Sequence, residues 1–566
     1  MRRLTRKACL LAALGLCAVA WSKAAEGPLR RALSFSSLAT SLRDVDAGKI
    51  IQALQEMRLR PIRQAWAEFW DIFGPGGRLH PDWFIEHQGH LFIEGGLMAI
   101  ILVLFFQSGY RPSKEQEEEP LTEREIDELC REWKPEPLVP DIAEEDQLPE
   151  PPVIQEWENS HWVTVAGRRA LNLTAADFLG LSNDPSVAAA ARATVERYGV
   201  GSCGPRGFYG TFDVHLQLEQ DLAAFMGEEE AIIYSYDIAT VASVIPAFAS
   251  RADILVMDEG CSYPIQQGAK LSRARVFTFK HNDAGDLAAL LGRIEAEEAR
   301  ERKPLCRRMI VVEGVYSNTG EVAPLRRIYE LKERYKYRLC VEETLSFGVM
   351  GERGRGACEA AGLEPGQVEI ICASMSGALG SVGGFCVGHS EVCDHQRLCG
   401  QGYCFSASLP PYLATAAIAA LRILGTPDGQ ALARRVRGAA AELRAALAAG
   451  PPGLVLAGAA DGPAAASPVV HLHLDPSVES RLGPRPAVAA ALQRVADILL
   501  QRYGVFVALP RYSVLDEVHP RQSIKLVANA ALASEGRVEH VASALREAAA
   551  EVLGGSDGGS DGGGAA

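Results

Sequence analysis

Six short apolar runs, separated by helix-like stretches, constrain the fold of this 566-residue chain most strongly. The runs lie at residues 231–234, 254–257, 276–279, 309–312, 339–341 and 368–372. Continuous apolar runs that alternate with helices are typical of a buried, mostly parallel sheet. The sequence therefore predicts an α/β fold with a large, mostly parallel-sheet domain, which we place at residues 161–425.

Polar side chains follow several of these runs. Asp258, Glu313 and Glu342 each come directly after a run, and a glycine-rich turn at 374–384 follows the last run. Ligands of open parallel sheets bind at the carboxyl ends of the strands. We therefore expect these residues to share one rim of the sheet and to mark a candidate site.

A smaller α/β domain is predicted at residues 426–553. Apolar runs at 469–474, 505–508 and 524–527 alternate there with helical stretches. The last residues, 554–566, have the sequence GGSDGGSDGGGAA, which is typical of a disordered tail.

The overall composition excludes several classes of protein. With 48% apolar and 23% charged residues the chain is globular, and its net charge of −14 argues against a nucleic-acid partner. The 13 cysteines form no C-x-x-C pair and accompany no histidine cluster. This pattern argues against a metal site and against a disulfide scaffold, and it indicates a reducing compartment.

The N-terminal region carries two apolar segments. Residues 1–25 begin with basic side chains and continue with an apolar stretch, which is typical of a signal peptide or a short signal anchor. The alternatives are an organellar leader and an N-terminus wrongly assigned to the gene. An N-terminal extension without recognisable chemistry follows at 26–90. The second apolar segment, at 91–110, is interrupted by Glu94 and its continuous part is short of the roughly 20 residues that span a bilayer. The flanking Trp83 and Tyr110, with Arg111 after them, favour one transmembrane helix over a buried or interfacial helix.

An acidic, proline-rich stretch follows this segment. Residues 111–160 include EQEEE and PEPPVIQEWE, which are typical of an extended linker. Within the stretch, residues 132–140 have the sequence EWKPEPLVP. We interpret this segment as a tether that either stays solvated or packs onto the body or a partner.

A glycine-rich segment precedes the apolar runs. Residues 198–215, YGVGSCGPRGFYGTFDVH, hold five glycines, and Arg206 supplies a rigid fork that suits a carboxylate or a phosphate. The segment resembles that of the α-oxoamine synthases, pyridoxal-phosphate (PLP) enzymes that condense an amino acid with an acyl-CoA. Within this family it is most similar to the lysine-lacking long-chain-base subunits of serine palmitoyltransferases. The tether at 132–140 and the sequence GQGYCFSASLPP at 400–411 carry the same resemblance, which extends over about 91–552.

The resemblance implies a PLP-dependent transferase fold of type I from which the catalytic parts are missing. The position of the coenzyme lysine falls on Gly377, and no lysine occurs in residues 337–524. Four further coenzyme or substrate positions are altered, at Ser262, Glu342, Leu345 and Lys525. Asp177 and Asp237 are additional departures from the family pattern.

Other motifs of the family are retained. By resemblance, Ser406 or Ser408 reaches the coenzyme phosphate of a neighbouring subunit. The glycine-rich segment lies near the subunit interface and the substrate cleft in relatives, which implicates Cys203, Gly204, Pro205, Arg206, Tyr209 and Thr211. Cys203 is expected to pack rather than to act as a nucleophile, because nothing nearby in the sequence would activate its thiol.

The resemblance implies a non-catalytic but required subunit. A lysine-bearing partner, in a heterodimer or a higher oligomer, would hold PLP and condense L-serine with palmitoyl-CoA to 3-ketosphinganine, CoA and CO₂. The complex would sit in the endoplasmic reticulum membrane through the single span, with the body facing the cytosol. The alternatives are a self-sufficient homodimeric synthase, against which the missing lysine speaks, and a membrane scaffold or regulator without a share in catalysis.

Overall fold

The computed structural model of the chain describes residues 97, 121–138, 151–301, 304–458, 465–511, 520–534 and 536–554. The chain divides into two units, Met1–Glu136 and Pro137–Ala566. Among the described residues, no helix is both long and apolar enough to cross a bilayer. Apart from Leu97, the span predicted at 91–110 lies outside the described residues, as do the predicted leader, the extension and nearly all of the tail.

The first unit contains one described helix of ten residues, α7 (Glu123–Glu132), inside the predicted linker. The Thr122 hydroxyl accepts a hydrogen bond from the backbone N–H of Glu125 at 3.4 Å, and the Glu125 carboxylate accepts from the N–H of Thr122 at 2.8 Å. This reciprocal capping box satisfies two N–H groups that a helix end otherwise leaves open. The predicted linker therefore contains a capped helix.

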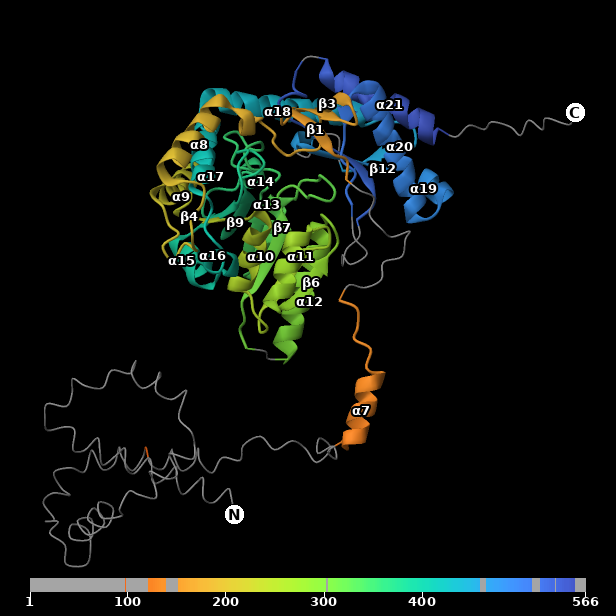
Figure 1. The fold of residues 1–566 in the computed structure, drawn as a ribbon. Coiled ribbons are helices and arrows are strands. Elements are labelled where there is room, and N and C mark those ends of the chain that lie inside the picture. Colours follow the sequence, from red (N-terminus) through yellow and green to blue (C-terminus); the bar gives the residue numbers. More distant parts are fainter. Residues whose placement is uncertain are drawn as a thin grey trace, which may run out of the picture. The chain divides into compact units, whose positions relative to one another are not determined.

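The second unit is built around a seven-stranded sheet in the order β4-β10-β9-β8-β7-β5-β6 (Figure 1). Its strands are β4 (Glu230–Tyr234), β5 (Ile254–Asp258), β6 (Arg275–Phe279), β7 (Arg308–Glu313), β8 (Arg338–Glu342), β9 (Ile370–Ser374) and β10 (Gly384–Gly388). The strands from β6 to β9 pair in parallel, whereas β10 runs antiparallel to β9 and β4. Each of the six predicted runs overlaps one strand, so the α/β prediction is confirmed with a mixed sheet.

Helices lie between successive strands of this sheet in the sequence, as predicted, and several of them pack on the sheet. Helix α10 (Asp237–Phe248) contacts β9 and β10, α12 (Ala284–Glu301) contacts β6, and α13 (Leu325–Tyr335) contacts β8. The other helices of this part are η4 (Leu181–Asn183), α8 (Pro185–Tyr198), α9 (Asp213–Met226), α11 (Tyr263–Ser272), α14 (Ala357–Ala360), α15 (Ser390–Cys399), α16 (Gln401–Cys404) and α17 (Pro411–Leu424).

The C-terminal part holds two smaller sheets. One has the order β11-β12-β14, and the other, β1-β2-β3-β13, joins three early strands to a late one. These strands are β1 (Ile154–Asn159), β2 (Trp162–Val165), β3 (Arg168–Asn172), β11 (Leu454–Leu456), β12 (Val469–Leu474), β13 (Val505–Phe506) and β14 (Ser523–Val527). The helices are α18 (Pro427–Leu447), α19 (Pro476–Leu482), α20 (Arg485–Tyr503) and α21 (Arg537–Leu553).

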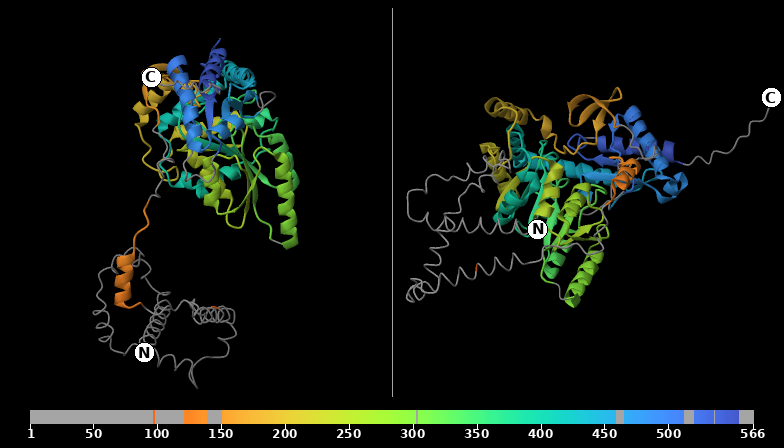
Figure 2. Two further views of the ribbon diagram at one scale, coloured as in Figure 1. Left: turned by 90° about the vertical axis from the view of Figure 1, so that its right-hand side faces the viewer. Right: turned by 60° about the horizontal axis from the view of Figure 1, so that its bottom comes forward.

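The domain boundaries predicted from the sequence differ from this arrangement. Strand β1 falls in the range predicted as linker, and β3, at the start of the predicted large domain, pairs in parallel with β13 of the predicted small domain. Both views of Figure 2 show the early strands beside the C-terminal helices. One apolar cluster also runs from Leu171 to Leu553. The two predicted domains therefore share one core.

Candidate functional site

Four strands of the central sheet end in polar residues at one rim. Asp258 ends β5, Glu313 ends β7, Glu342 ends β8 and Ser374 ends β9. Glu313 and Glu342 are direct neighbours in the register of the parallel pair β7–β8. The predicted rim is therefore present, and it concentrates carboxyl groups.

The two neighbouring glutamates differ in their partners. Glu313 is fully buried and accepts hydrogen bonds from the backbone N–H groups of Ser262 at 2.5 Å and Ser317 at 2.8 Å. Burial raises the pKa of Glu342 to about 8, and the nearby charge of Glu313 adds to this effect. The Glu342 carboxyl also bonds to the N–H and the hydroxyl of Thr344, two residues along. At neutral pH Glu342 is therefore mostly protonated and engaged with its own loop.

Gly377 lies against the wall of this rim. A Cβ at this position would be 3.3 Å from the carbonyl oxygen of Ala176 and 3.4 Å from Cε2 of Phe178. The contact with the Ala176 carbonyl is tight and the one with Phe178 is ordinary van der Waals contact, so a side chain at this position would require a shift of a few tenths of an ångström. Leu345, one of the altered positions, is buried next to Thr344 in the sequence.

Lys525 approaches from the C-terminal part. It lies on β14 directly opposite His471 of β12. Burial lowers the pKa of Lys525, and the charge of Glu313 works against this effect. Burial likewise lowers the pKa of His471 to about 3, and its Nδ1 lies 2.8 Å from the Ser523 hydroxyl. The charges of Lys525 on β14 and Glu313 at the rim therefore influence each other.

In the glycine-rich segment, Arg206 is turned inward. Its guanidinium donates two hydrogen bonds of 2.9 Å to the Glu219 carboxylate, and both side chains are buried. Glu219 also accepts from the backbone N–H of Ile233 on β4. The Arg206 Nε donates to the Thr211 hydroxyl, which donates in turn to the Arg206 carbonyl. The arginine predicted to face a shared cleft therefore fixes the segment to α9 and to the sheet.

Ser408 is also engaged inside the chain. It is buried, its hydroxyl donates to the carbonyl oxygen of Gly210, and its N–H donates to the carbonyl of Gly204 at 2.9 Å. Gly210 has no room for a side chain, because a Cβ there would overlap the Gly204 carbonyl. The hydroxyl of the half-buried Ser406 donates to the carbonyl of Gly402 at 2.6 Å. Of the two serines, only Ser406 is partly accessible.

His215 links the glycine-rich segment to the segment that contains Ser408 and Leu409. Its Nδ1 accepts from the N–H of Phe212 at 3.1 Å, so Nε2 carries the proton and donates to the carbonyl of Leu409 at 2.7 Å. Burial lowers the pKa of His215 to about 4, which agrees with this neutral form. Sequence reasoning missed His215 and Glu219, although their i, i+4 spacing places both on the buried face of α9.

Four exposed aromatic side chains lie on the segments that contain or adjoin the contacts of Ser408 and His215. Phe208 and Tyr209 belong to the glycine-rich segment, Tyr236 precedes α10, and Phe405 follows α16, with Tyr209 fully exposed. The segments adjoin, because Ser408 bonds to the glycine-rich segment and the Ser235 hydroxyl donates to the Ala407 carbonyl. We call Phe208, Tyr209, Tyr236 and Phe405 the aromatic surface.

Backbone strain occurs within the same segment. Cys203 and Tyr209 have φ values of 59° and 66°, in the left-handed region that side-chain-bearing residues rarely adopt. Such conformations cost of order 1 kcal/mol each and persist where the surroundings impose them. Tyr209 thus combines a left-handed backbone with a fully exposed side chain.

The comparisons with known proteins place the chain in a family. Residues 168–545 match the family "aminotransferase class I and II". Long chain base biosynthesis protein 1b of Oryza sativa subsp. japonica is 42% identical over 83% of this chain and 93% of its own length. Serine palmitoyltransferase 1 of Dictyostelium discoideum is 38% identical over 79% of this chain and 91% of its own. The chain belongs to the long chain base 1 family.

Solved structures of this fold include a serine palmitoyltransferase of S. paucimobilis with a bound PLP–myriocin aldimine. It is 26% identical to this chain, with a TM-score of 0.62 over 71% of this chain and 93% of that one. The fold of the long chain base 1 family is thus the PLP-dependent aminotransferase-like α/β fold that the sequence predicts.

The rim of this family member does not fit PLP as its own coenzyme. Gly377 offers no amine for a covalent bond to PLP, and burial raises the pKa of Glu342 to about 8, which weakens this carboxyl as a partner for a pyridinium nitrogen. At the first turn of α10, where a helix N-terminus would suit a phosphate, Asp237 places a carboxylate instead. The rim therefore lacks the amine that would hold PLP covalently on this chain.

Asp177, the other departure, has a structural role. Its carboxylate accepts from the N–H of Gly180 at 3.0 Å and from the hydroxyl of Ser182 at 2.6 Å. Its carbonyl oxygen lies 2.8 Å from Nε2 of His161. Asp177 thus stabilises the turn that leads into α8.

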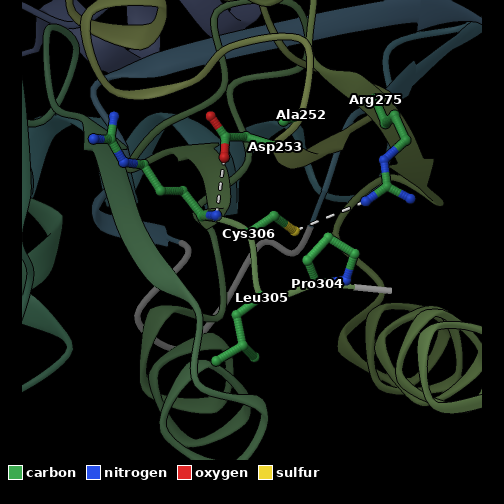
Figure 3. Close-up of a pocket in the computed structure, with 7 residues that line it drawn as sticks. Ala252, Asp253, Arg275, Pro304, Leu305 and Cys306 are labelled. Atoms are coloured by element: carbon green, nitrogen blue, oxygen red, sulfur yellow. Dashed lines mark hydrogen bonds between the residues drawn. The ribbon is translucent and has the colours of Figure 1, made fainter. Parts of the chain in front are cut away.

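A separate cavity of about 590 Å³ lies at the amino ends of the strands, on the side of the sheet opposite the rim. Figure 3 shows its lining, in which the N–H of Arg307 donates to Asp253 and the Arg275 guanidinium approaches the Cys306 sulfur at 3.8 Å. These residues lie at the amino ends of β5, β6 and β7. The cavity is therefore distinct from the rim and has no share in the candidate site.

Proposed function

We propose that this chain is the non-catalytic but required subunit of a serine palmitoyltransferase, the enzyme of the first step of sphingolipid biosynthesis. The observation that carries the proposal is Gly377, packed against Phe178 where the family places its lysine. The names of its relatives, long chain base biosynthesis protein 1 and serine palmitoyltransferase 1, support the assignment.

A second, lysine-bearing subunit would hold PLP covalently and supply the electron sink for decarboxylative condensation of L-serine with palmitoyl-CoA. This chain would stabilise that subunit and shape the cleft between them. Of the predicted cleft residues, Cys203, Tyr209 and Thr211 are exposed and Ser406 is half-buried, so Cys203 is not packed as expected from the sequence. The aromatic surface offers apolar area for the partner. Interface cores are enriched in aromatic residues, which supports a partner at this place.

We further propose that the complex resides in the endoplasmic reticulum membrane, anchored by a single span at 91–110, with the body in the cytosol. The interface-type aromatic and basic residues that flank this segment support the span. The scattered cysteines support a reducing compartment for the body.

Co-expression in a host without this activity tests the proposal. This chain alone, the lysine-bearing subunit alone and both together are assayed for 3-ketosphinganine at equal expression. We expect ketone formation from the pair at a rate well above either chain alone. Product from this chain alone would overturn the assignment, as would equal rates with and without it.

A second candidate is a scaffold with no share in catalysis. The inward contacts of Arg206 and Ser408 favour it, because neither side chain is free to reach a partner's site. Tyr209→Phe and Ser406→Ala separate the two functions. Under the proposed function one of these variants changes kcat or KM of the assembled enzyme, whereas under the scaffold function both leave the kinetics unchanged.

A further inference from the structure

Helix α7 carries an apolar stripe of exposed side chains. Ile126, Leu129, Cys130 and Trp133 follow the i, i+3, i+4, i+7 spacing, so they lie on one side of the helix. The exposed fractions of Ile126, Leu129 and Trp133 are 46%, 52% and 73%, and no residue of the helix is buried.

The rest of the helix surface is charged. All seven residues of α7 outside the stripe are acidic or basic, and its five carboxylates and two arginines give a net charge of −3. A ten-residue helix is marginal in water by itself, even with a capping box, so its stability depends on packing the stripe against another surface.

The net negative charge of α7 limits the kind of surface against which the stripe can pack. Interfacial helices that bind membranes are rich in lysine and arginine, because the cytoplasmic leaflet is anionic. An acidic helix is repelled there. A second copy of this chain is also disfavoured, since the whole chain carries a net charge of −14. The complementary surface is an apolar groove of a protein, with lysine or arginine at its rim.

We propose that α7 docks its stripe into such a groove on the lysine-bearing second subunit. The assignment of the groove to that subunit rests on the proposed function. Ile126, Leu129 and Trp133 would be the buried anchors, and the carboxylates that flank the stripe, Glu125 and Glu132, would face the basic rim. The helix would thus be a second contact with that subunit, on a segment of the chain separate from the aromatic surface.

The test uses the full-length chain co-expressed with the second subunit. A photo-crosslinking amino acid at position 129 should give an adduct with the second subunit, mapped by mass spectrometry to an apolar segment next to lysine or arginine. The same probe at position 124, on the charged side, should give little. An adduct of position 129 with lipid, or with another copy of this chain, would overturn the proposal.

Substitutions give an independent reading of the same contact. Leu129→Glu should weaken association of the two chains at least about tenfold, because it places a carboxylate among the anchors. Arg124→Glu introduces the same residue on the opposite side and should leave association nearly unchanged. Equal association of both variants would contradict the docking of the stripe.

Formation of 3-ketosphinganine by the wild-type pair distinguishes failure of the α7 docking from failure of the proposed function. If the pair is active but Leu129→Glu assembles normally and position 129 does not crosslink to the second subunit, the docking of α7 is wrong and the proposed function stands. If the wild-type chains neither assemble nor form 3-ketosphinganine, both are wrong.

Discussion

Arg206 and Glu219 form a buried pair whose two bonds use the full fork of the guanidinium. Removing one member of a buried pair leaves an uncompensated charge, which costs about 3–5 kcal/mol. We therefore expect Arg206→Ala to lower the free energy of unfolding by this amount, and Arg206→Lys to recover part of it because lysine cannot form both bonds. Chemical denaturation followed by tryptophan fluorescence measures the difference.

Arg197 provides the control for this prediction. It pairs with Asp213 at 3.3 Å, but both side chains are more than half exposed. Exposed ion pairs contribute about 0–1 kcal/mol, so Arg197→Ala should change stability little. Equal decreases in the free energy of unfolding from Arg206→Ala and Arg197→Ala would show that the buried pair contributes no more to stability than the exposed one.

Restoring the missing lysine should not restore a coenzyme site. Gly377→Lys would place a side chain against Phe178 and the Ala176 carbonyl, beside a mostly protonated Glu342. After removal of free PLP, we expect the variant to retain no more visible absorbance, and after borohydride treatment no more bound PLP, than the wild-type chain. The lysine-bearing subunit treated in the same way is the positive control. Reducible absorbance in the variant would mean that only the amine is missing.

The sequence showed which catalytic side chains are absent. It did not show where the retained side chains, such as Arg206 and Ser408, would point. A glycine at position 377 has no amine in any conformation, so that conclusion needed no structure. An arginine can bond to any carboxylate in reach, and the sequence does not say whether Arg206 meets Glu219 or a partner's substrate. The same applies to Ser408, whose hydroxyl finds the Gly210 carbonyl within its own chain.

At the level of elements, the strands of the central sheet were predictable because apolar β-rich runs alternate with helices. Strand β10 was missed, since its five residues begin at Gly384 and its pairing is antiparallel. Strand β1 was missed because its exposed, charged residues lack an apolar side. The pairing of β3 with β13 joins distant parts of the chain, and no local pattern encodes it.

His281 joins three elements at the rim. Its Nδ1 lies 2.8 Å from the Asp258 carboxylate at the end of β5, and its Nε2 lies 2.8 Å from Glu321 in the turn before α13. Burial alone would lower the pKa of His281, but the hydrogen bonds and charges of Asp258 and Glu321 outweigh it and raise the pKa to about 9.

This raised pKa predicts how stability depends on pH. The stabilisation is complete below the ordinary histidine pKa of about 6.5, declines as the pH rises, and is lost above about pH 9. His281→Gln should therefore be less stable than the wild type by up to about 3 kcal/mol near pH 6, since the ring keeps some contact with water, and the gap should close by pH 10. Urea denaturation across this range measures it, and a gap independent of pH would contradict the protonated clamp.

At the level of the whole molecule, one core unites the early strands, the central sheet and the C-terminal helices. The glycine at position 377 has therefore not been accompanied by loss of packing: a rim without a lysine sits on an intact fold. An intact scaffold with an exposed aromatic surface is what the proposed supporting subunit requires.

The aromatic surface makes the last prediction. If Phe208, Tyr209, Tyr236 and Phe405 meet the second subunit, truncating the most exposed of them removes buried interface area and leaves the monomer's core unchanged. Tyr209→Ser with Phe405→Ser should weaken association at least about tenfold, mainly through faster dissociation. Leu305→Ser is the matched control, because Leu305 is 96% exposed at the opposite edge of the sheet. Biolayer interferometry with the purified chains measures both rates, and unchanged dissociation of the double variant would place the partner on another face.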